Sequence, residues 1–300
     1  MGKQVGQLRF LRRGPGAKPE ITRSGHGEVR NVESNLNSGF RRRHGVGMRR
    51  RIQHASAVER LQAQLARRGD RPVAPQPLKL APDAGTLSEH ESHRLLAAYG
   101  IPVTRTRLIA PDAIDRLKRA PLAYPLAVKI DSPDIAHKTE AGAVRLGVRN
   151  LRALKQAAHD VMGAARRYKP DAHINGVLLS EMAQGTEVIV GAVNDRFFGP
   201  VVMLGLGGVF TELLQAVSYR FAPFDLDTAH DMIHAMPAHP VLTGYRGKPA
   251  LAIDALADAL VRVSLLVADH AARIAEIDIN PLFVGADNVV AADALVVLRA

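Results

Sequence analysis

The sequence predicts an α/β (α+β) fold for residues 86–300. Two observations favour this class: short apolar runs of strand length alternate with longer stretches of helical period, and capping residues, glycine and proline separate them. Two segments precede the fold. Residues 1–55 are expected to be a disordered basic leader. Residues 56–85 are expected to be a linker, in which a helical stretch, Ala57–Arg68, gives way to three prolines that favour an extended chain.

The excess positive charge of the chain lies in the leader. Residues 1–80 hold 18 Lys and Arg against 5 Asp and Glu, whereas residues 81–300 hold 22 against 24. Arginine runs at 41–43 and 49–51 leave open a basic arm for nucleic acid or acidic lipid, or a transit peptide. Because no Phe, Tyr or Trp lies between Arg41 and Arg51 to stack bases, we favour a solvated tail or a misplaced translation start, and expect no nucleic-acid partner.

The composition also bears on the compartment. The chain has no cysteine, which excludes disulfides and thiolate metal sites and suits the reducing cytoplasm. The longest apolar stretch, Val201–Phe210, is about half the length that a membrane-spanning helix requires. The basic start is not followed by the apolar run of a secretory signal. We therefore expect a cytoplasmic protein with no membrane partner.

Boundary residues place most of the expected elements. Ser88 and Glu91 form a capping box before a helix that Gly100 and Pro102 end, and Asn150 caps a longer helix that runs to about Tyr168. Further helices are expected near Leu226–Ala235 and Ile253–Asp269. Strands are expected at Pro125–Asp131, Ala143–Val148, Val177–Met182, Glu187–Val193 and Val201–Leu204, and a final hairpin pairs Ile274–Asn280 with Val289–Val297.

Lys129 stands in the middle of an apolar strand. Because burying an ammonium group without a partner is costly, Lys129 either faces a cleft and binds a phosphate, or lies on an edge strand and points to water. The polar segment Ser132–Gly142 follows directly and places His137 beside Lys138. A histidine there could act as a nucleophile or proton shuttle, although a lone loop histidine is more often only solvated.

Oxygen-bearing side chains on the final hairpin are candidates for a metal site. Glu276, Asp278 and Asn280 alternate with aliphatic residues and therefore share one face of a strand, while Asp293 lies in the facing strand. Two oxygen ligands on adjacent strands, completed by phosphate oxygens and water, suit Mg²⁺. The alternative is a half-exposed strand with a polar face.

Two further groups carry weaker signals. Glu181 and Glu187 flank a turn, where they could bind ribose hydroxyls or an adenine amino group, or be the solvated acids of an ordinary hairpin. The stretch Gly205–Gly208, followed by Arg220 in a strand-like segment, permits either the close approach of a ligand or merely a tight turn.

The order of five motifs resembles a known family. The motifs are Ser88–Pro102, Lys129–Glu140, Phe198–Gly208, Gly244–Gly247 and Glu276–Leu282. Over residues 86–298 they are similar to the ATP-grasp, nucleotide-binding (beta) part of ADP-forming acetyl- and acyl-CoA synthetases, which are relatives of succinyl-CoA synthetase. Five motifs in order are more specific than any one of them.

The resemblance implies a two-lobed ATP-grasp fold, with lobe one at about 86–180 and lobe two at about 181–300, that clasps ATP. It implies that Lys129 contacts phosphate, that His137 carries the phosphoryl group beside Lys138, and that Asn280 and Asp293 bind Mg²⁺. The remaining implied contacts are Glu181 and Met182 at the adenine, Glu187 at the ribose, and Gly207, Gly208 and Arg220 at the phosphate end of the cleft.

The resemblance also implies a reaction and a partner. In such enzymes acyl-CoA and phosphate give an acyl phosphate, and the phosphoryl group passes by way of histidine to ADP, which yields a carboxylic acid, CoA and ATP. A CoA-binding subunit or domain is implied as the partner, since residues 1–85 cannot supply it. Two positions depart from the family pattern, at Ala143 and Ala216. A non-catalytic regulatory domain and an inactive truncated fragment are the alternatives, and the acyl group and ADP versus GDP stay open.

Overall fold

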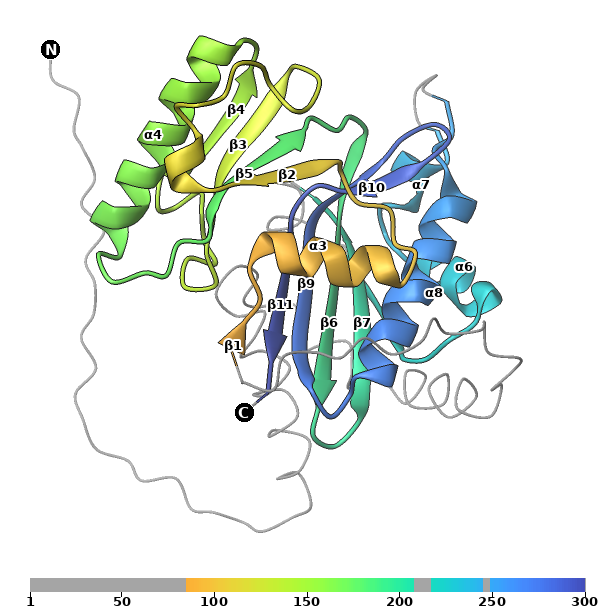
Figure 1. Ribbon diagram of the computed structural model, residues 1–300. Coiled ribbons are helices and arrows are strands. Elements are labelled where there is room, and N and C mark those ends of the chain that lie inside the picture. Colours follow the sequence, from red (N-terminus) through yellow and green to blue (C-terminus); the bar gives the residue numbers. More distant parts are fainter. Residues whose placement is uncertain (1–84, 208–216, 245–248, 300) are drawn as a thin grey trace, which may run out of the picture.

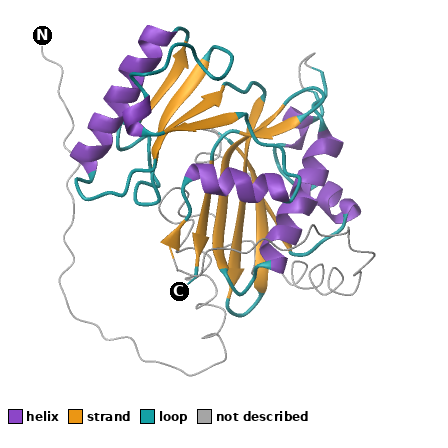
Figure 2. Cartoon of the chain, in the orientation of Figure 1, coloured by secondary structure: helices purple, strands orange, loops and turns teal. Residues whose placement is uncertain are grey.

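The computed structural model describes residues 85–207, 217–244 and 249–299. These residues form two lobes, each built on an antiparallel sheet (Figure 1, Figure 2). The expected leader, nearly all of the linker, Gly208, Ala216 and most of the motif at 244–247 lie outside the described residues.

The larger sheet has seven strands among the described residues. Its order is β1–β11–β9–β6–β7–β8, and β10 pairs with β9. Along β9, buried Ile277 and Ile279 alternate with half-buried Glu276, Asp278 and Asn280, so one face is apolar and the other polar, as expected. The bounds are β1 (Gly85–Thr86), β6 (Thr186–Asp195), β7 (Gly199–Leu206), β8 (Val217–Phe221), β9 (Ile274–Val284), β10 (Val289–Ala291) and β11 (Ala294–Leu298).

Helices α3 (Glu89–Ala98), α6 (Leu226–His234) and α8 (Ile253–Asp269) pack on the apolar face of this sheet, and a short helix, α7 (His239–Leu242), follows α6. Leu95 and Leu96 of α3 lie in the same core as Leu260 of α8 and Ile277 of β9. The Tyr99 hydroxyl at the end of α3 donates a hydrogen bond to Asp269 of α8 (3.1 Å). Helix α3 is therefore fixed to the larger sheet.

The smaller lobe has a four-stranded sheet in the order β2–β5–β3–β4. Helix α4 (Leu151–Tyr168) packs on one face of it, against Leu126, Val128 and Ile130 of β3. Because side chains alternate along a strand, Lys129 and Asp131 point to the opposite face. The strands are β2 (Thr106–Ile109), β3 (Leu126–Asp131), β4 (Val144–Val148) and β5 (Gly176–Glu181), and a single 3₁₀ turn, η2 (Pro111–Ala113), follows β2.

The lobe boundary differs from the sequence prediction. Lobe one was expected to begin at about residue 86, but β1 pairs with β11 and α3 lies in the core of the larger sheet. The chain crosses to the smaller lobe only after α3, where Val103 bridges Ala291 and Thr104 bonds Ser180 (2.9 Å). The first helix is carried by the larger lobe because its apolar stripe packs there, which local sequence pattern does not reveal.

Candidate functional site

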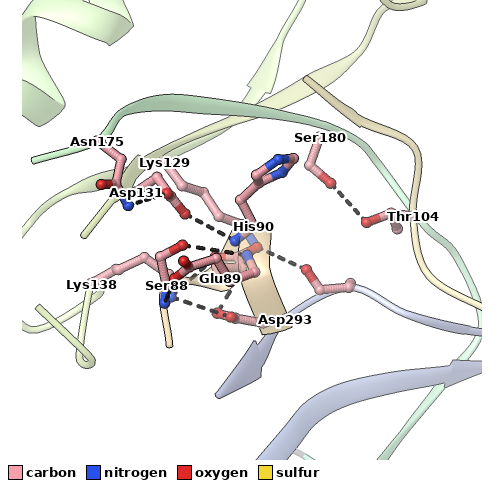
Figure 3. Close-up of polar contacts among 12 residues, drawn as sticks. Ser88, Glu89, His90, Thr104, Lys129, Asp131, Lys138, Asn175, Ser180 and Asp293 are labelled. Atoms are coloured by element: carbon pink, nitrogen blue, oxygen red, sulfur yellow. Dashed lines mark hydrogen bonds and ion pairs between the residues drawn. The ribbon is translucent and has the colours of Figure 1, made fainter. Parts of the chain in front are cut away.

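Lys129 is buried at the junction of the two lobes. Its Nζ lies 2.6 Å from Glu89 Oε1 and donates to the Ala292 carbonyl oxygen at 2.9 Å, and it lies 3.9 Å from Asp293 Oδ2 (Figure 3). Strand β3 has neighbours on both sides, and the Lys129 side chain is 8% exposed. The edge-strand alternative for Lys129 is thus excluded, and its partners come from the other lobe.

Lys138 reaches the same two carboxylates. Its Nζ lies 3.0 Å from Glu89 Oε2 and 3.3 Å from Asp293 Oδ1. Burial alone lowers the pKa of Lys138, but the charges of Glu89 and Asp293 outweigh it, and the pKa is raised above its ordinary value. We call Glu89, Lys129, Lys138 and Asp293 the charge cluster. It joins α3, β3, the segment after β3 and the turn before β11.

Glu89 is the member of the charge cluster that sequence reasoning missed. Its side chain is fully buried, and burial raises its pKa, but the charges of Lys129 and Lys138 outweigh this and leave the pKa below its ordinary value. An acid in the first turn of a helix is usually explained by the helix dipole. One signal was available in the sequence. The capping box uses Glu91, whose carboxylate accepts from the Ser88 backbone N–H, so Glu89 has no part in capping the helix.

Asn280 and Asp293 lie side by side at a break in the β-ladder. The sequence predicts one continuous hairpin, but β9 faces two short strands, β10 and β11, interrupted at Ala292 and Asp293. The Asn280 N–H donates to the Asp293 carbonyl at 3.1 Å, and the freed Ala292 carbonyl accepts from Lys129. Such irregularities re-aim side chains beside functional sites.

The break fits a magnesium site. It brings together an amide and a carboxylate, both hard oxygen donors of the kind that Mg²⁺ prefers. The Asp293 side chain is 32% exposed, so part of it is accessible to solvent. Mg²⁺ usually keeps only one or two protein ligands and fills its octahedron with water and substrate phosphates, which this donor set allows.

The histidine segment, residues 132–142, is anchored at its start. Ser132 Oγ donates to the His173 carbonyl at 2.6 Å, and the Asp134 carboxylate accepts from the His173 N–H (2.7 Å) and pairs with Lys169 (3.0 Å). Beyond these anchors, His137 is half-buried, and its backbone carbonyl accepts from the Ala141 N–H. The next residue, Lys138, ties the segment to the larger lobe.

Two further buried groups of the junction come from α3 and β3. Asp131 is fully buried and accepts from the His90 N–H and from Asn175 Nδ2, both at 2.9 Å (Figure 3). His93 is 2% exposed, and burial together with the charge of Lys129 lowers its pKa to about 4. The sequence analysis gave neither Asp131 nor His93 a role in the site, because nothing in the local pattern shows which lobe they face.

The residues expected at the adenine and ribose lie along β5, β6 and their connection. Glu181 pairs with Arg105 (3.3 Å), while Met182 and Glu187 are exposed. Gly207 donates its N–H to the Glu187 carbonyl at 2.7 Å, and a Cβ on Gly207 would lie 2.6 Å from Glu187 Cβ. Close packing against β6 therefore requires a glycine at 207 whether or not a ligand approaches it.

Arg220 lies on β8, away from the strands that carry Asn280 and Asp293. Its Nη1 donates to the Tyr219 carbonyl at 2.8 Å. The register pairs Arg220 with Val202, Val202 with Ala192, and Ala192 with Ile277. Opposite residues of antiparallel strands share a face, so Arg220 projects to the side of Ile277 and not to that of Asp278. A role at the phosphate end stays a prediction.

The family model described as "ATP-grasp domain" matches residues 79–298. This chain belongs to the ATP-grasp domain family. Within this family, the chain is 42% identical to the acetate–CoA ligase [ADP-forming] I subunit beta of Pyrococcus furiosus. The alignment spans 214 residues, which are 71% of this chain and 91% of that protein.

Solved structures extend the likeness of this ATP-grasp domain. Dinucleotide-forming acetyl-coenzyme A synthetase 1 of Ca. Korarchaeum cryptofilum, in complex with coenzyme A, Ca-AMPCP and HgCl+, is 37% identical, with a TM-score of 0.67 over 72% of this chain and 94% of that chain. A second complex of that protein, with coenzyme A and Mg-AMPPCP, has a phosphohistidine segment pointing towards the nucleotide binding site. It is 34% identical, with a TM-score of 0.61, and covers 72% of this chain and 93% of that chain.

These findings confirm the expected family and fold. The resemblance was expected over residues 86–298, and the family model matches residues 79–298, so the two ends agree at residue 298 and the match begins seven residues earlier than expected. The roles of the individual site residues are proposals.

Proposed function

We propose that this ATP-grasp domain is the nucleotide-binding (beta) subunit of an ADP-forming acyl-CoA synthetase, an acid–CoA ligase that uses ATP or ADP with Mg²⁺. The observation that carries the proposal is the charge cluster. Lys129, Lys138 and Asp293 meet at one place where the two lobes join, and His137 is the neighbour of Lys138. The relative named above as acetate–CoA ligase [ADP-forming] I subunit beta supports the same activity.

The cluster supplies groups that phosphoryl transfer needs. When a nucleotide binds, Lys129 and Lys138 donate hydrogen bonds to phosphate oxygens and offset their negative charge, which is most of what catalysis requires in this reaction class. Asn280 and Asp293 would hold Mg²⁺, which neutralises phosphate charge when bound. Glu181, Met182 and Glu187 would contact the adenosine, and Gly207 and Gly208 would line the phosphate end. Arg220 is proposed at the phosphate end on the resemblance alone, since the strand register turns it to the face of the sheet opposite to Asp278.

His137 is proposed as the phosphoryl carrier. In the ATP-forming direction, a β-phosphate oxygen of ADP attacks the phosphorus of phosphorylated His137, a P–O bond forms and the N–P bond breaks. The imidazole leaves as a neutral ring after taking one proton from solvent. The phosphohistidine segment in the similar synthetase, which points towards its nucleotide site, supports this role.

The acyl chemistry takes place on a partner. We propose that a CoA-binding subunit or domain forms the acyl phosphate from acyl-CoA and phosphate, and that acyl-CoA and carboxylic acid are indirect substrates of this chain. Pairing with such a partner is supported by the relative that is named as a beta subunit. Among the described residues, none of the helices has the length and apolar character of a membrane span. We propose a cytoplasmic location, which the absence of cysteine from the sequence suits.

Binding of Mg-ADP by the chain alone tests the proposal. At one hundred times the dissociation constant, a ligand stabilises the folded state by about 2.7 kcal/mol, so the melting temperature is expected to rise by about 5 to 10 °C. The measurement is a thermal melt followed by circular dichroism, with Mg²⁺ alone and Mg²⁺ plus inorganic phosphate as controls. An unchanged melt of the folded chain in millimolar Mg-ADP contradicts the proposal.

A further inference from the structure

Glu89 is shared between the two lysines of the charge cluster. One carboxylate oxygen lies 2.6 Å from Lys129 Nζ and the other lies 3.0 Å from Lys138 Nζ. The carboxylate has no exposed surface, whereas that of Asp293 is 32% exposed. The two acids therefore differ in their surroundings: Asp293 is partly exposed and lies farther from the lysines, so it can turn to a ligand, whereas Glu89 is fully buried and would lose its partners if it moved away from the lysines.

Glu89 belongs to the larger lobe, whereas the two lysines belong to the smaller lobe. Its backbone belongs to the first turn of α3, which is fixed by the capping box of Ser88 and Glu91 and by the bond from the His90 N–H to Asp131. The rest of α3 packs in the core of the larger sheet. Lys129 and Lys138 come from the smaller lobe, so Glu89 sets their position relative to the strands that carry Asn280 and Asp293.

The charges of the cluster change when a metal binds. Two lysines face two carboxylates, and the four groups are balanced. If Asp293 binds Mg²⁺, as the proposed function requires, it no longer pairs with Lys129 and Lys138. Glu89 is then the one carboxylate left in the cluster to hold both ammonium groups, and the lysines and Glu89 together present one net positive charge to the nucleotide phosphates.

We propose that Glu89 is a positioning residue, which holds Lys129 and Lys138 in place so that Asp293 is released to Mg²⁺ and the lysines are presented to phosphate. The inference rests on the proposed function. A carboxylate that served only to stabilise the fold would affect nucleotide binding equally with and without metal. A positioning residue that competes with Asp293 for the lysines affects nucleotide affinity more in the presence of Mg²⁺ than in its absence.

The substitution Glu89→Gln separates the two cases. It keeps the shape of the side chain but removes one negative charge, so the lysines hold Asp293 more tightly and the cluster gains one positive charge. We expect the affinity for ADP in EDTA to be unchanged or higher. The affinity for Mg-ADP is expected to fall, so that the gain in affinity on adding Mg²⁺ drops by about tenfold or more, as removal of one outer-shell partner of a metal ligand typically does.

Glu91→Gln is the matched control. Glu91 lies in the same helical turn and is exposed, and its carboxylate accepts a hydrogen bond from the Ser88 backbone N–H. It is expected to lower the melting temperature slightly and to leave both ADP affinities as in the wild type. Titration calorimetry of the full chain with ADP, in EDTA and in Mg²⁺, measures the two affinities of the wild type and of each variant.

The outcomes are distinguishable. If the wild type binds no Mg-ADP, the proposed function fails and this inference with it. If the wild type binds and Glu89→Gln keeps the full gain from Mg²⁺, the proposed function stands and the positioning role is wrong. If Glu89→Gln does not fold, Glu89→Asp carries the test. It retains the charge on a shorter side chain and is expected to slow labelling of His137 at saturating Mg-ATP by about threefold or more, and an unchanged rate overturns the inference.

Discussion

Replacing His137 with alanine is expected to abolish phosphoryl transfer while leaving nucleotide binding intact. Loss of a nucleophile lowers turnover by about a thousandfold or more, because no other route to the covalent intermediate is as fast. Affinity for Mg-ADP is expected to change by less than about threefold, which corresponds to less than 1 kcal/mol. The reason is that Lys129, Lys138 and Asp293 keep their places without the imidazole.

The measurement is the label that the chain retains from γ-labelled ATP, with and without a CoA-binding partner. A phosphohistidine is labile in acid and stable in base, which separates it from phosphoserine. His159→Ala is the matched control, since His159 is exposed on α4 and pairs with Asp115 at 2.9 Å. Retained acid-labile label on His137→Ala would assign the carrier role to another residue. Turnover without label would favour direct transfer from the partner, and binding without any transfer in the wild type would favour a regulatory domain.

Replacing Asp293 with alanine is expected to remove most of the dependence of nucleotide binding on Mg²⁺. Loss of an outer-shell partner of a metal ligand typically weakens binding by about 10- to 100-fold. Loss of a direct ligand is expected to weaken Mg-ADP binding by at least as much. Binding of ADP in EDTA is expected to persist, since Lys129 and Lys138 keep Glu89 as their common partner. Asn280→Ala is expected to act in the same direction with a smaller effect, because an amide oxygen carries no charge.

Asp287→Ala is the control for this prediction. Asp287 is an exposed carboxylate in the connection between β9 and β10, on the same hairpin as Asn280. It is expected to bind Mg-ADP as the wild type does. Titration calorimetry with ADP at several Mg²⁺ concentrations decides the matter, and an unchanged Mg²⁺ dependence in both Asp293→Ala and Asn280→Ala means that the metal lies elsewhere.

Local sequence pattern was sufficient where an element is determined by its own residues. The Ser88 capping box, the Asn150 cap and the span Ile253–Asp269 are observed as predicted, because caps and helical periodicity act within one or two turns. The alternation that put Glu276, Asp278 and Asn280 on one face of a strand is likewise observed. The order of motifs predicted the family before any geometry was known.

Contacts between distant segments were beyond such reasoning. Glu89 and Lys129 are 40 residues apart and belong to different lobes, so only packing shows that they share a site. The break between β10 and β11 follows from the register of three strands, and the sequence around Asp293 is compatible with one continuous strand. The hydrogen bond from the His90 backbone N–H to the buried Asp131 carboxylate was missed for the same reason.

Reconstituted turnover tests the central claim most directly. The pure chain, mixed with acetyl-CoA, phosphate and ADP in Mg²⁺, is expected to form no ATP, because the acyl phosphate must come from a CoA-binding partner. Adding the CoA-binding subunit with which it copurifies from its native cell is expected to give ATP, and His137→Ala in the same mixture is expected to give none. ATP formation by the pure chain alone, or equal rates with wild type and His137→Ala in the complex, would contradict the account.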